Sequence, residues 1–155
     1  MRVLFVCLGN ICRSPLAEGL FVHQLSRTGK THLFESDSCG TGNYHIGALP
    51  DQRTRRNAES NGIVLTHRCR QIIPEDLELF DLILPMDSNN LKNILALPDA
   101  ERHRHKIMLM RTFDPEAGHL DVPDPYHGTD EDFQEVFEIL DRSVAGLIGH
   151  LEDQA

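Results

Sequence analysis

The stretch that decides the fold of this chain is RVLFVCLGNICRSP, residues 2–15. Residues 2–6 form a short, mainly apolar run that suits a buried strand. Ser14 and Pro15 predict a helix start, with Ser14 as the cap and Pro15 at the first helical position, where its missing N–H costs nothing. The loop between them has to curl around the helix N-terminus, so its backbone N–H groups converge on one point. The stretch therefore predicts an anion site between a strand and a helix.

The residue types in this loop suit a thiolate that faces a tetrahedral oxyanion. Cys7 lies where a helix N-terminus favours ionisation, so we expect a thiolate at neutral pH. Arg13 carries a planar fork that binds two phosphate oxygens at once. Gly9 and Asn10 tolerate a positive φ, and the Ser14 hydroxyl is expected to donate to the Cys7 sulfur and help it leave. The expected phosphate-binding residues are Leu8, Gly9, Asn10, Ile11, Cys12, Arg13 and Ser14.

A purely structural interpretation makes Cys7 a buried cysteine at the end of a strand and Arg13 a surface residue. The combination with glycine, asparagine and Ser-Pro in the same loop disfavours that interpretation. A Walker-type nucleotide loop is excluded, because the pattern GxxxxGK[ST] is absent.

Length and composition predict one globular domain over residues 1–155, with 40% hydrophobic and 25% charged residues. The net charge of −9 argues against a nucleic-acid partner. No apolar stretch approaches the ~20 residues of a membrane span, and we expect neither a signal peptide nor a membrane partner. The four cysteines do not form a secreted disulfide framework. A working thiolate favours a reducing compartment, so the expected location is cytoplasmic.

Strand and helix patterns alternate along the chain, which predicts an α/β fold with a four-stranded parallel sheet and helices on both faces. Ligands in such sheets bind beyond the carboxyl ends of the strands. We expect strands at 2–6, 33–38, 80–84 and 106–110, and helices at 15–28, at 51–61, after Asp87 or Ser88, and at 133–151.

A second chemical segment, residues 121–128, lies in the loop before the last helix. Hydrolysis of a phosphate monoester requires protonation of the leaving oxygen, which an acidic side chain on a loop can supply. Asp114, Asp121 and Asp124 each lie close to a proline, and their pattern does not distinguish among them.

Nine histidines and four cysteines raise the question of a metal site. The densest cluster, residues 102–105, is flanked by arginine and has no CxxC or HxxxH partner. We therefore expect no metal and interpret the cluster as exposed surface. Asp87 is expected only to cap a helix.

The segment CLGNICRSP-x-AE resembles the phosphate loop of the low-molecular-weight protein tyrosine phosphatases, and the match continues in order through nearly the whole chain. The resemblance implies a flavodoxin-like sheet with strand order 2-1-3-4, a cysteinyl-phosphate intermediate and no cofactor. It is also carried by Asp37-Ser38, Gly47, Pro50-Asp51, Arg53, residues 67–71, Met86-Asp87, Asn90-Leu91 and Asp124-Pro125-Tyr126.

The resemblance also assigns roles. It selects Asp124, directly before Pro125-Tyr126, as the general acid. It places Tyr44 and Tyr126 in the walls of the substrate cleft. Many relatives have a second tyrosine after Tyr126, where this chain has His127.

Two further residues, Ser38 and His67, match family positions that hydrogen-bond Asn10 and support the loop together with Ser14. The resemblance thus implies catalytic Cys7, Arg13 and Asp124, supported from behind by a polar network.

The implied substrates are phosphotyrosine proteins, because the long phosphotyrosine side chain can reach a buried thiolate. A cognate kinase is expected among these partners. Protein arginine phosphatases are the first alternative, but they typically carry threonine where this loop has Ile11. Thioredoxin-coupled arsenate reductases need two further, closely spaced cysteines, and only Cys69 lies in a suitable region. A non-catalytic phosphopeptide-binding module would not need Cys7, Arg13 and an aspartate loop together.

Overall fold

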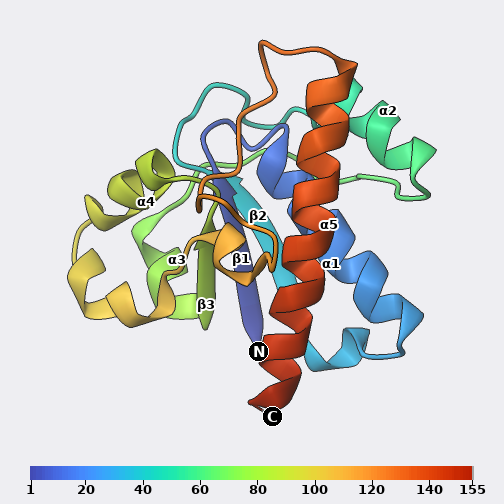
Figure 1. Ribbon diagram of the computed structural model, residues 1–155. Coiled ribbons are helices and arrows are strands. Elements are labelled where there is room, and N and C mark those ends of the chain that lie inside the picture. Colours follow the sequence, from blue (N-terminus) through green and yellow to red (C-terminus); the bar gives the residue numbers. More distant parts are fainter. Residues whose placement is uncertain (155) are drawn as a thin grey trace.

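The computed structural model describes residues 1–154 and contains a parallel three-stranded sheet in the order β2-β1-β3. The strands are β1 (Arg2–Cys7), β2 (Glu35–Gly40) and β3 (Leu82–Pro85). Val6 of β1 lies opposite both Cys39 and Pro85, so the three strands end at the same edge of the sheet. In Figure 1 both chain termini lie at the opposite end of the molecule from this edge.

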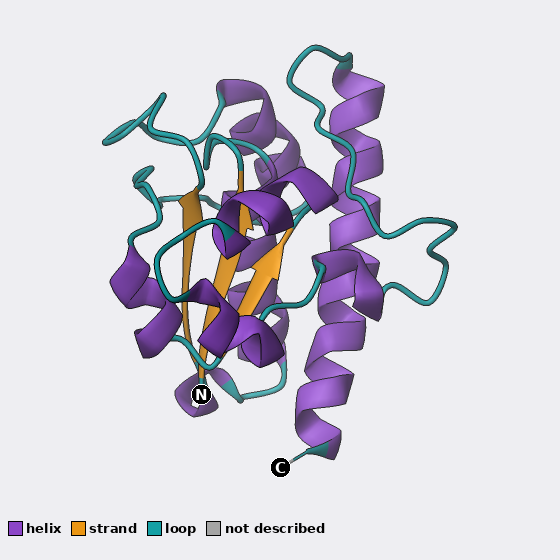
Figure 2. Ribbon diagram, turned by 90° about the vertical axis from the view of Figure 1, so that its left-hand side faces the viewer, coloured by secondary structure: helices purple, strands orange, loops and turns teal. Residues whose placement is uncertain are grey.

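Helices cover both faces of the sheet (Figures 1 and 2). One face carries α1 (Arg13–Arg27) and α5 (Asp130–Asp153), with α2 (Gln52–Ser60) packed against α5. The other carries α3 (Pro74–Leu79) and α4 (Ser88–Leu95). Strand β1 alternates between the two cores: Val3 and Phe5 join the α1 and α5 side, and Leu4 and Val6 join the other side. Each face of the central strand is therefore buried, as its apolar run predicts.

The helices expected at 15–28, at 51–61, after Asp87 or Ser88, and at 133–151 are present as α1, α2, α4 and α5. Asp51 caps α2 by accepting from the Arg53 N–H, and Asp87 caps α4 by accepting from the Asn90 N–H. The buried face of α5 contains apolar residues at steps of three and four, which is typical of an amphipathic helix: Phe133, Val136, Phe137, Leu140, Val144, Leu147 and Leu151.

The predicted fourth strand at 106–110 is wrong. One 3₁₀ helix, Ala100–Lys106, occupies its start, and another, Met110–Phe113, occupies its end. Only a single parallel bridge, Ile107 to Ile83, joins the segment to β3, with the Met108 N–H donating to the Ile83 carbonyl at 3.0 Å. The chain passes beside β3, but the extended part is too short for a ladder. The apolar residues Ile107 and Met110 are buried without being part of a strand.

Three smaller expectations also need correction. Leu33 lies in a 3₁₀ turn, Thr31–Leu33, so the second strand begins later than predicted, at Glu35. Helix α3 was not expected. In the cluster at 102–105, His103 is buried against Glu78, so this segment is not simply exposed surface.

Candidate active site

A cavity of about 380 Å³ opens at the carboxyl edge of the sheet, where the loop after β1 meets two other loops. It contains most of the residues expected from the sequence and one, His45, that was not expected. Asn10 and Ser14 do not line it and lie behind the loop. The lining residues are Cys7, Leu8, Gly9, Ile11, Cys12, Arg13, Tyr44, His45, Asp124, Tyr126 and His127.

The loop after β1 directs its carbonyl groups away from the cavity. The carbonyls of Cys7 and Leu8 accept from the amides of Thr41 and Gly42, both at 2.9 Å. The carbonyl of Ile11 accepts from the Asp51 amide at 2.8 Å. Within residues 1–154, the amides of residues 8–12 have no protein acceptor. These amides are therefore available to an anion at the start of α1.

Asn10 holds this loop from behind. It is fully buried and has a positive φ of 57°. Its side-chain oxygen accepts from His67 Nε2 (2.9 Å) and from the Arg70 N–H (3.0 Å). Its Nδ2 donates to Ser14 Oγ (2.8 Å) and Ser38 Oγ (3.0 Å). All the hydrogen-bonding capacity of the amide is used, which compensates for the left-handed backbone.

The structure thus places Ser14, Ser38 and His67 around Asn10, where the family resemblance puts them. Gly9, in contrast, lacks the expected positive φ. Its small size matters instead, because a Cβ there would lie 3.3 Å from the ring of His45.

The expectation that Ser14 caps α1 is wrong. The helix begins at Arg13 with Cys12 as its N-cap residue, so Ser14 lies inside the first turn. Its hydroxyl lies 3.0 Å from Cys7 Sγ and 3.3 Å from the Cys39 carbonyl. Because this hydroxyl already accepts from Asn10, its single proton is free for the sulfur or the carbonyl. The first turn of α1 contains no acidic residue, so its N-terminus stays favourable for an anion.

The Arg13 side chain is oriented by groups far away in the sequence. It is 2% exposed, and its Nη1 donates to Asp87 Oδ2 at 2.6 Å and to the Val122 carbonyl at 3.0 Å. Burial opposes the charged form, but Cys7, Asp87 and Asp124 together raise the pKa of Arg13. The guanidinium therefore stays charged.

Asp87 consequently does more than cap a helix. One of its carboxylate oxygens caps α4 and the other holds Arg13. Sequence reasoning missed this second contact, although one signal was available: Asp87 lies two residues after the end of β3, the neighbour of β1 at the site edge of the sheet.

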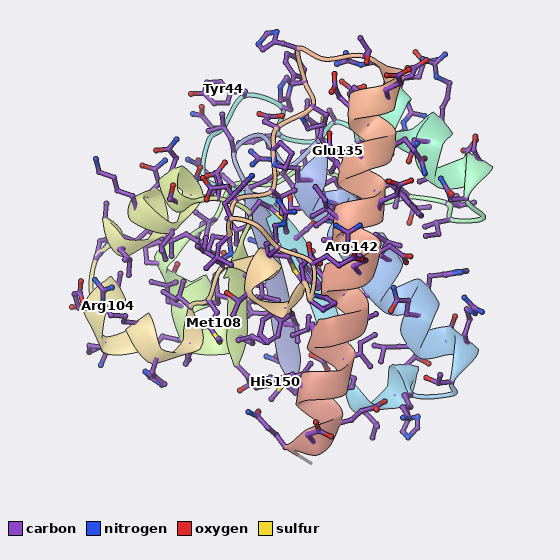
Figure 3. All side chains as sticks on the ribbon, viewed as in Figure 1. Tyr44, Arg104, Met108, Glu135, Arg142 and His150 are labelled. Carbon is purple, nitrogen blue, oxygen red and sulfur yellow. The ribbon has the colours of Figure 1, made fainter. Side chains whose placement is uncertain are left out.

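The three candidate acids have different surroundings. Asp114 is buried between Arg111 and Arg142, each at 3.1 Å, and these partners lower its pKa although burial opposes the shift. Arg142, labelled on α5 in Figure 3, donates to both carboxylate oxygens of Asp114. Asp121 accepts from the Ser88 N–H at 2.9 Å.

Of the three, only Asp124 lines the cavity. Its side chain is 45% exposed, and its Oδ2 lies 3.6 Å from Arg13 Nη2. Its Oδ1 accepts from the Tyr126 N–H at 3.2 Å. The structure therefore brings Asp124, and not the other two aspartates, to the thiol and the guanidinium.

Aromatic rings border the cavity mouth. Tyr44 is 69% exposed and Tyr126 41% exposed. Tyr44 extends outward from the loop after β2 (Figure 3). The ring of His127 lies edge-on to that of Tyr126, with centroids 5.0 Å apart. The wall of the substrate cavity thus contains tyrosine phenol rings and one imidazole ring.

One group of possible metal ligands lies behind the loop, away from the histidine cluster considered from the sequence. His67 Nδ1 lies 3.4 Å from Glu18 Oε1 and 3.4 Å from Asp37 Oδ1. The rest of this group supports the loop: Asp37 Oδ2 accepts from Arg70, and His67 Nε2 contacts Asn10. Burial raises the pKa of Glu18 to about 7.

Comparisons with known proteins show which proteins this chain resembles as a whole. Residues 2–155 match the family model "Low molecular weight phosphotyrosine protein phosphatase". A low-molecular-weight protein-tyrosine-phosphatase from Streptomyces coelicolor is 39% identical over 99% of this chain and 94% of its own. The crystal structure of a protein tyrosine phosphatase from Entamoeba histolytica superposes with a TM-score of 0.94 at 36% identity, covering 99% of this chain and 98% of that one.

An arginine phosphatase from Drosophila has a similar structure, with a TM-score of 0.88 at 27% identity over 97% of this chain and 98% of that chain. The family model spans nearly the whole chain, and the Streptomyces coelicolor relative is similar over nearly its full length. The chain therefore belongs to the low molecular weight phosphotyrosine protein phosphatase family.

Proposed function

We propose that the chain hydrolyses phosphotyrosine in proteins through a cysteinyl-phosphate, with Cys7 as nucleophile, Arg13 as phosphate ligand and Asp124 as general acid and base. The observation that carries this proposal is that Cys7, Arg13 and Asp124 line one cavity. No cofactor enters the mechanism, because the loop amides and Arg13 supply the positive potential.

In the first step the Cys7 thiolate attacks phosphorus in line with the leaving oxygen. The sulfur–phosphorus bond forms as the phosphorus–oxygen bond breaks, and the electron pair of that bond passes to the phenolic oxygen. Asp124 gives that oxygen a proton. The amides of residues 8–12 and the Arg13 guanidinium bind the three equatorial oxygens of the phosphoryl group. These oxygens share its negative charge in the transition state, which the donors therefore stabilise.

In the second step water attacks phosphorus and Asp124 accepts its proton. The sulfur–phosphorus bond breaks, and inorganic phosphate and the Cys7 thiolate result. The Ser14 hydroxyl, 3.0 Å from the sulfur, donates to the departing thiolate. Cys12 takes no part as an anion, since burial raises its pKa to about 12.

The cavity lining supports an aryl phosphate. Ile11, Tyr44 and Tyr126 offer apolar and aromatic surface to a phenyl ring. The similarity to an arginine phosphatase makes phosphoarginine the main competing substrate. Ile11 argues against phosphoarginine as the substrate, because arginine phosphatases typically have threonine at this position of the loop.

A comparison of substrates tests the proposal. Matched peptides carrying phosphotyrosine, phosphoarginine or phosphoserine are incubated with the wild-type protein and with Cys7→Ser, and the release of phosphate is measured; phosphotyrosine should be hydrolysed fastest by the wild type. Rapid quenching should trap one phosphate on the wild-type chain and none on the variant. Equal or faster release of phosphate from phosphoarginine would assign the chain to the arginine substrates. Binding without release would make it a phosphopeptide-binding module.

We also propose a cytoplasmic location and phosphoprotein partners for this chain. All four cysteines are free and buried, which suits a reducing compartment such as the cytoplasm. No helix within residues 1–154 is long and apolar enough to cross a membrane. The partners are phosphotyrosine proteins, among them a kinase whose tyrosine phosphorylation the enzyme reverses.

A further inference from the structure

Arg53, in the first turn of α2, connects two parts of the site that are far apart in the sequence. Its guanidinium forms a fork with Asp51, with Nε 3.1 Å from Oδ1 and Nη2 2.9 Å from Oδ2. These hydrogen bonds lower the pKa of Asp51, although burial opposes the shift. The guanidinium thus has a charged, bidentate partner throughout the neutral pH range.

On one side this ion pair is fixed to the phosphate loop. The Asp51 amide donates to the Ile11 carbonyl at 2.8 Å, so the residue that orients Arg53 also holds a loop carbonyl away from the cavity. The position of Arg53 is therefore set relative to the loop that binds the phosphate.

On the other side the guanidinium lies over two aromatic rings. Its central carbon is 5.4 Å from the ring centroid of Tyr126 and 4.6 Å from that of Phe133, in the first turn of α5. Both distances are within the range of cation–π attraction. Tyr126 is 41% exposed, and its backbone N–H donates to Asp124. A contact that restrains the Tyr126 ring thus acts two residues away from Asp124.

The geometry points to Arg53 as the positioning residue that clamps the Asp124 loop to the phosphate loop, through the Tyr126 ring. Arg53 does not line the cavity and touches no reacting atom. It acts by holding the substrate wall and the general acid at a set distance from Cys7. This inference rests on the proposed role of Asp124.

The first test measures the dependence of rate on the leaving group. Arg53→Met keeps an unbranched stem but removes the charge and the fork. For this variant kcat/KM on a phosphotyrosine peptide should fall about threefold to thirtyfold. The loss should be distinctly smaller on p-nitrophenyl phosphate, whose leaving group depends less on an acid. Arg53→Lys should lie between, because an ammonium keeps the charge but lacks the planar fork.

Arg56→Met is the matched control, since Arg56 is an exposed arginine on the same helix. It should leave kcat/KM unchanged on both substrates. Equal losses on the two substrates in Arg53→Met would overturn the inference, because they would place Arg53 in phosphate binding or in general stability. Should Arg53→Met fail to fold, the same comparison on Arg53→Lys decides.

A second measurement follows the wall itself. The chain has two tyrosines and no tryptophan, so Tyr44→Phe leaves Tyr126 as its single tyrosine fluorophore. In that background Arg53→Met should lower the fluorescence anisotropy of Tyr126, and Arg56→Met should not. Unchanged anisotropy in Arg53→Met contradicts the clamp. If Asp124→Asn shows no leaving-group effect, the proposed function fails, whatever Arg53 does.

Discussion

The phosphate loop and the Asp124 loop face the same cavity but are held in different ways. Asn10 and Ser14 are fully buried and Arg13 is 2% exposed, and each has several partners. Asp124 and Tyr126, in contrast, are nearly half exposed, and their side chains meet few groups. The first region is over-determined by hydrogen bonds, whereas the second relies on weaker stacking and on one ion pair at 3.6 Å.

This difference suits the chemistry. Oxyanion stabilisation requires donors that are already in place before the substrate arrives. The acid acts on a leaving group that enters and departs at the mouth of the cavity, so its loop has to remain accessible. Substitutions in the buried region should therefore affect folding and rate together, and those in the exposed loop should affect rate alone.

The largest effect is expected at the centre of the buried region. Cys7→Ser should lower turnover on the order of 10⁴-fold or more, because a serine hydroxyl is not ionised by the loop. Phosphate binding, measured by calorimetry, should be largely retained, since the amides and Arg13 remain. Cys39→Ser, at a buried cysteine on β2, serves as the control and should keep most of the activity. Residual turnover well above background in Cys7→Ser would remove Cys7 from the nucleophile role.

The exposed loop should show the next largest effect. Asp124→Asn should cost roughly 10²–10⁴-fold in kcat/KM on a phosphotyrosine peptide. The loss should be smaller on p-nitrophenyl phosphate, and the melting temperature should hardly change. Asp121→Asn is the control, because Asp121 bonds to Ser88 and does not line the cavity. A leaving-group effect in Asp121→Asn, and none in Asp124→Asn, would mean that the wrong aspartate has been chosen.

A third prediction separates backbone strain from hydrogen bonding in the buried region. Asn10→Ala loses four hydrogen bonds and places alanine at a φ of 57°. We expect a loss of about 2–4 kcal/mol in the free energy of unfolding, together with a loss of activity. Asn10→Gly tolerates this φ, so denaturant unfolding should show a smaller loss for glycine. Identical losses would mean that the left-handed backbone contributes nothing.

The smallest effect concerns pH and the group behind the loop. Burial raises the pKa of Glu18 from 4.5 to about 7. A carboxyl with a raised pKa favours the folded state below its unfolded value, and this contribution is lost as the pH rises through the folded value. Relative to Glu18→Gln, the wild type should therefore lose stability between about pH 4.5 and about pH 7, by about 1–3 kcal/mol.

Unfolding measured across this pH range checks the sign of that effect. His67, whose pKa burial lowers, is present in both proteins but lies 3.4 Å from Glu18 Oε1, so the difference between them reports Glu18 together with its coupling to His67. A difference that does not change with pH, or that changes in the opposite direction, would show that Glu18 is already charged in the folded protein at low pH.

Elements whose signals are local could be predicted from the amino-acid sequence. Strand β1, the turn into α1 and the long helix α5 follow from apolar periodicity and from residues within a few positions of one another. The phosphate loop was readable for the same reason: Cys7 and Arg13 lie in one continuous stretch. The resemblance to a family then selected Asp124, which pattern alone had left level with Asp114 and Asp121.

The remaining features depend on contacts between residues far apart in the sequence. Asp87 reaches Arg13 across 74 residues, and the pairing of β3 with β1 is what brings the two side chains together. His45 enters the cavity because its loop folds back over Gly9. The apolar pattern at 106–110 predicts a strand, yet the two ends of this segment belong to two 3₁₀ helices. Ile107 and Met110 are nevertheless buried. An apolar residue type indicates that a side chain is buried. The backbone conformation in which it is buried depends on the elements packed around it.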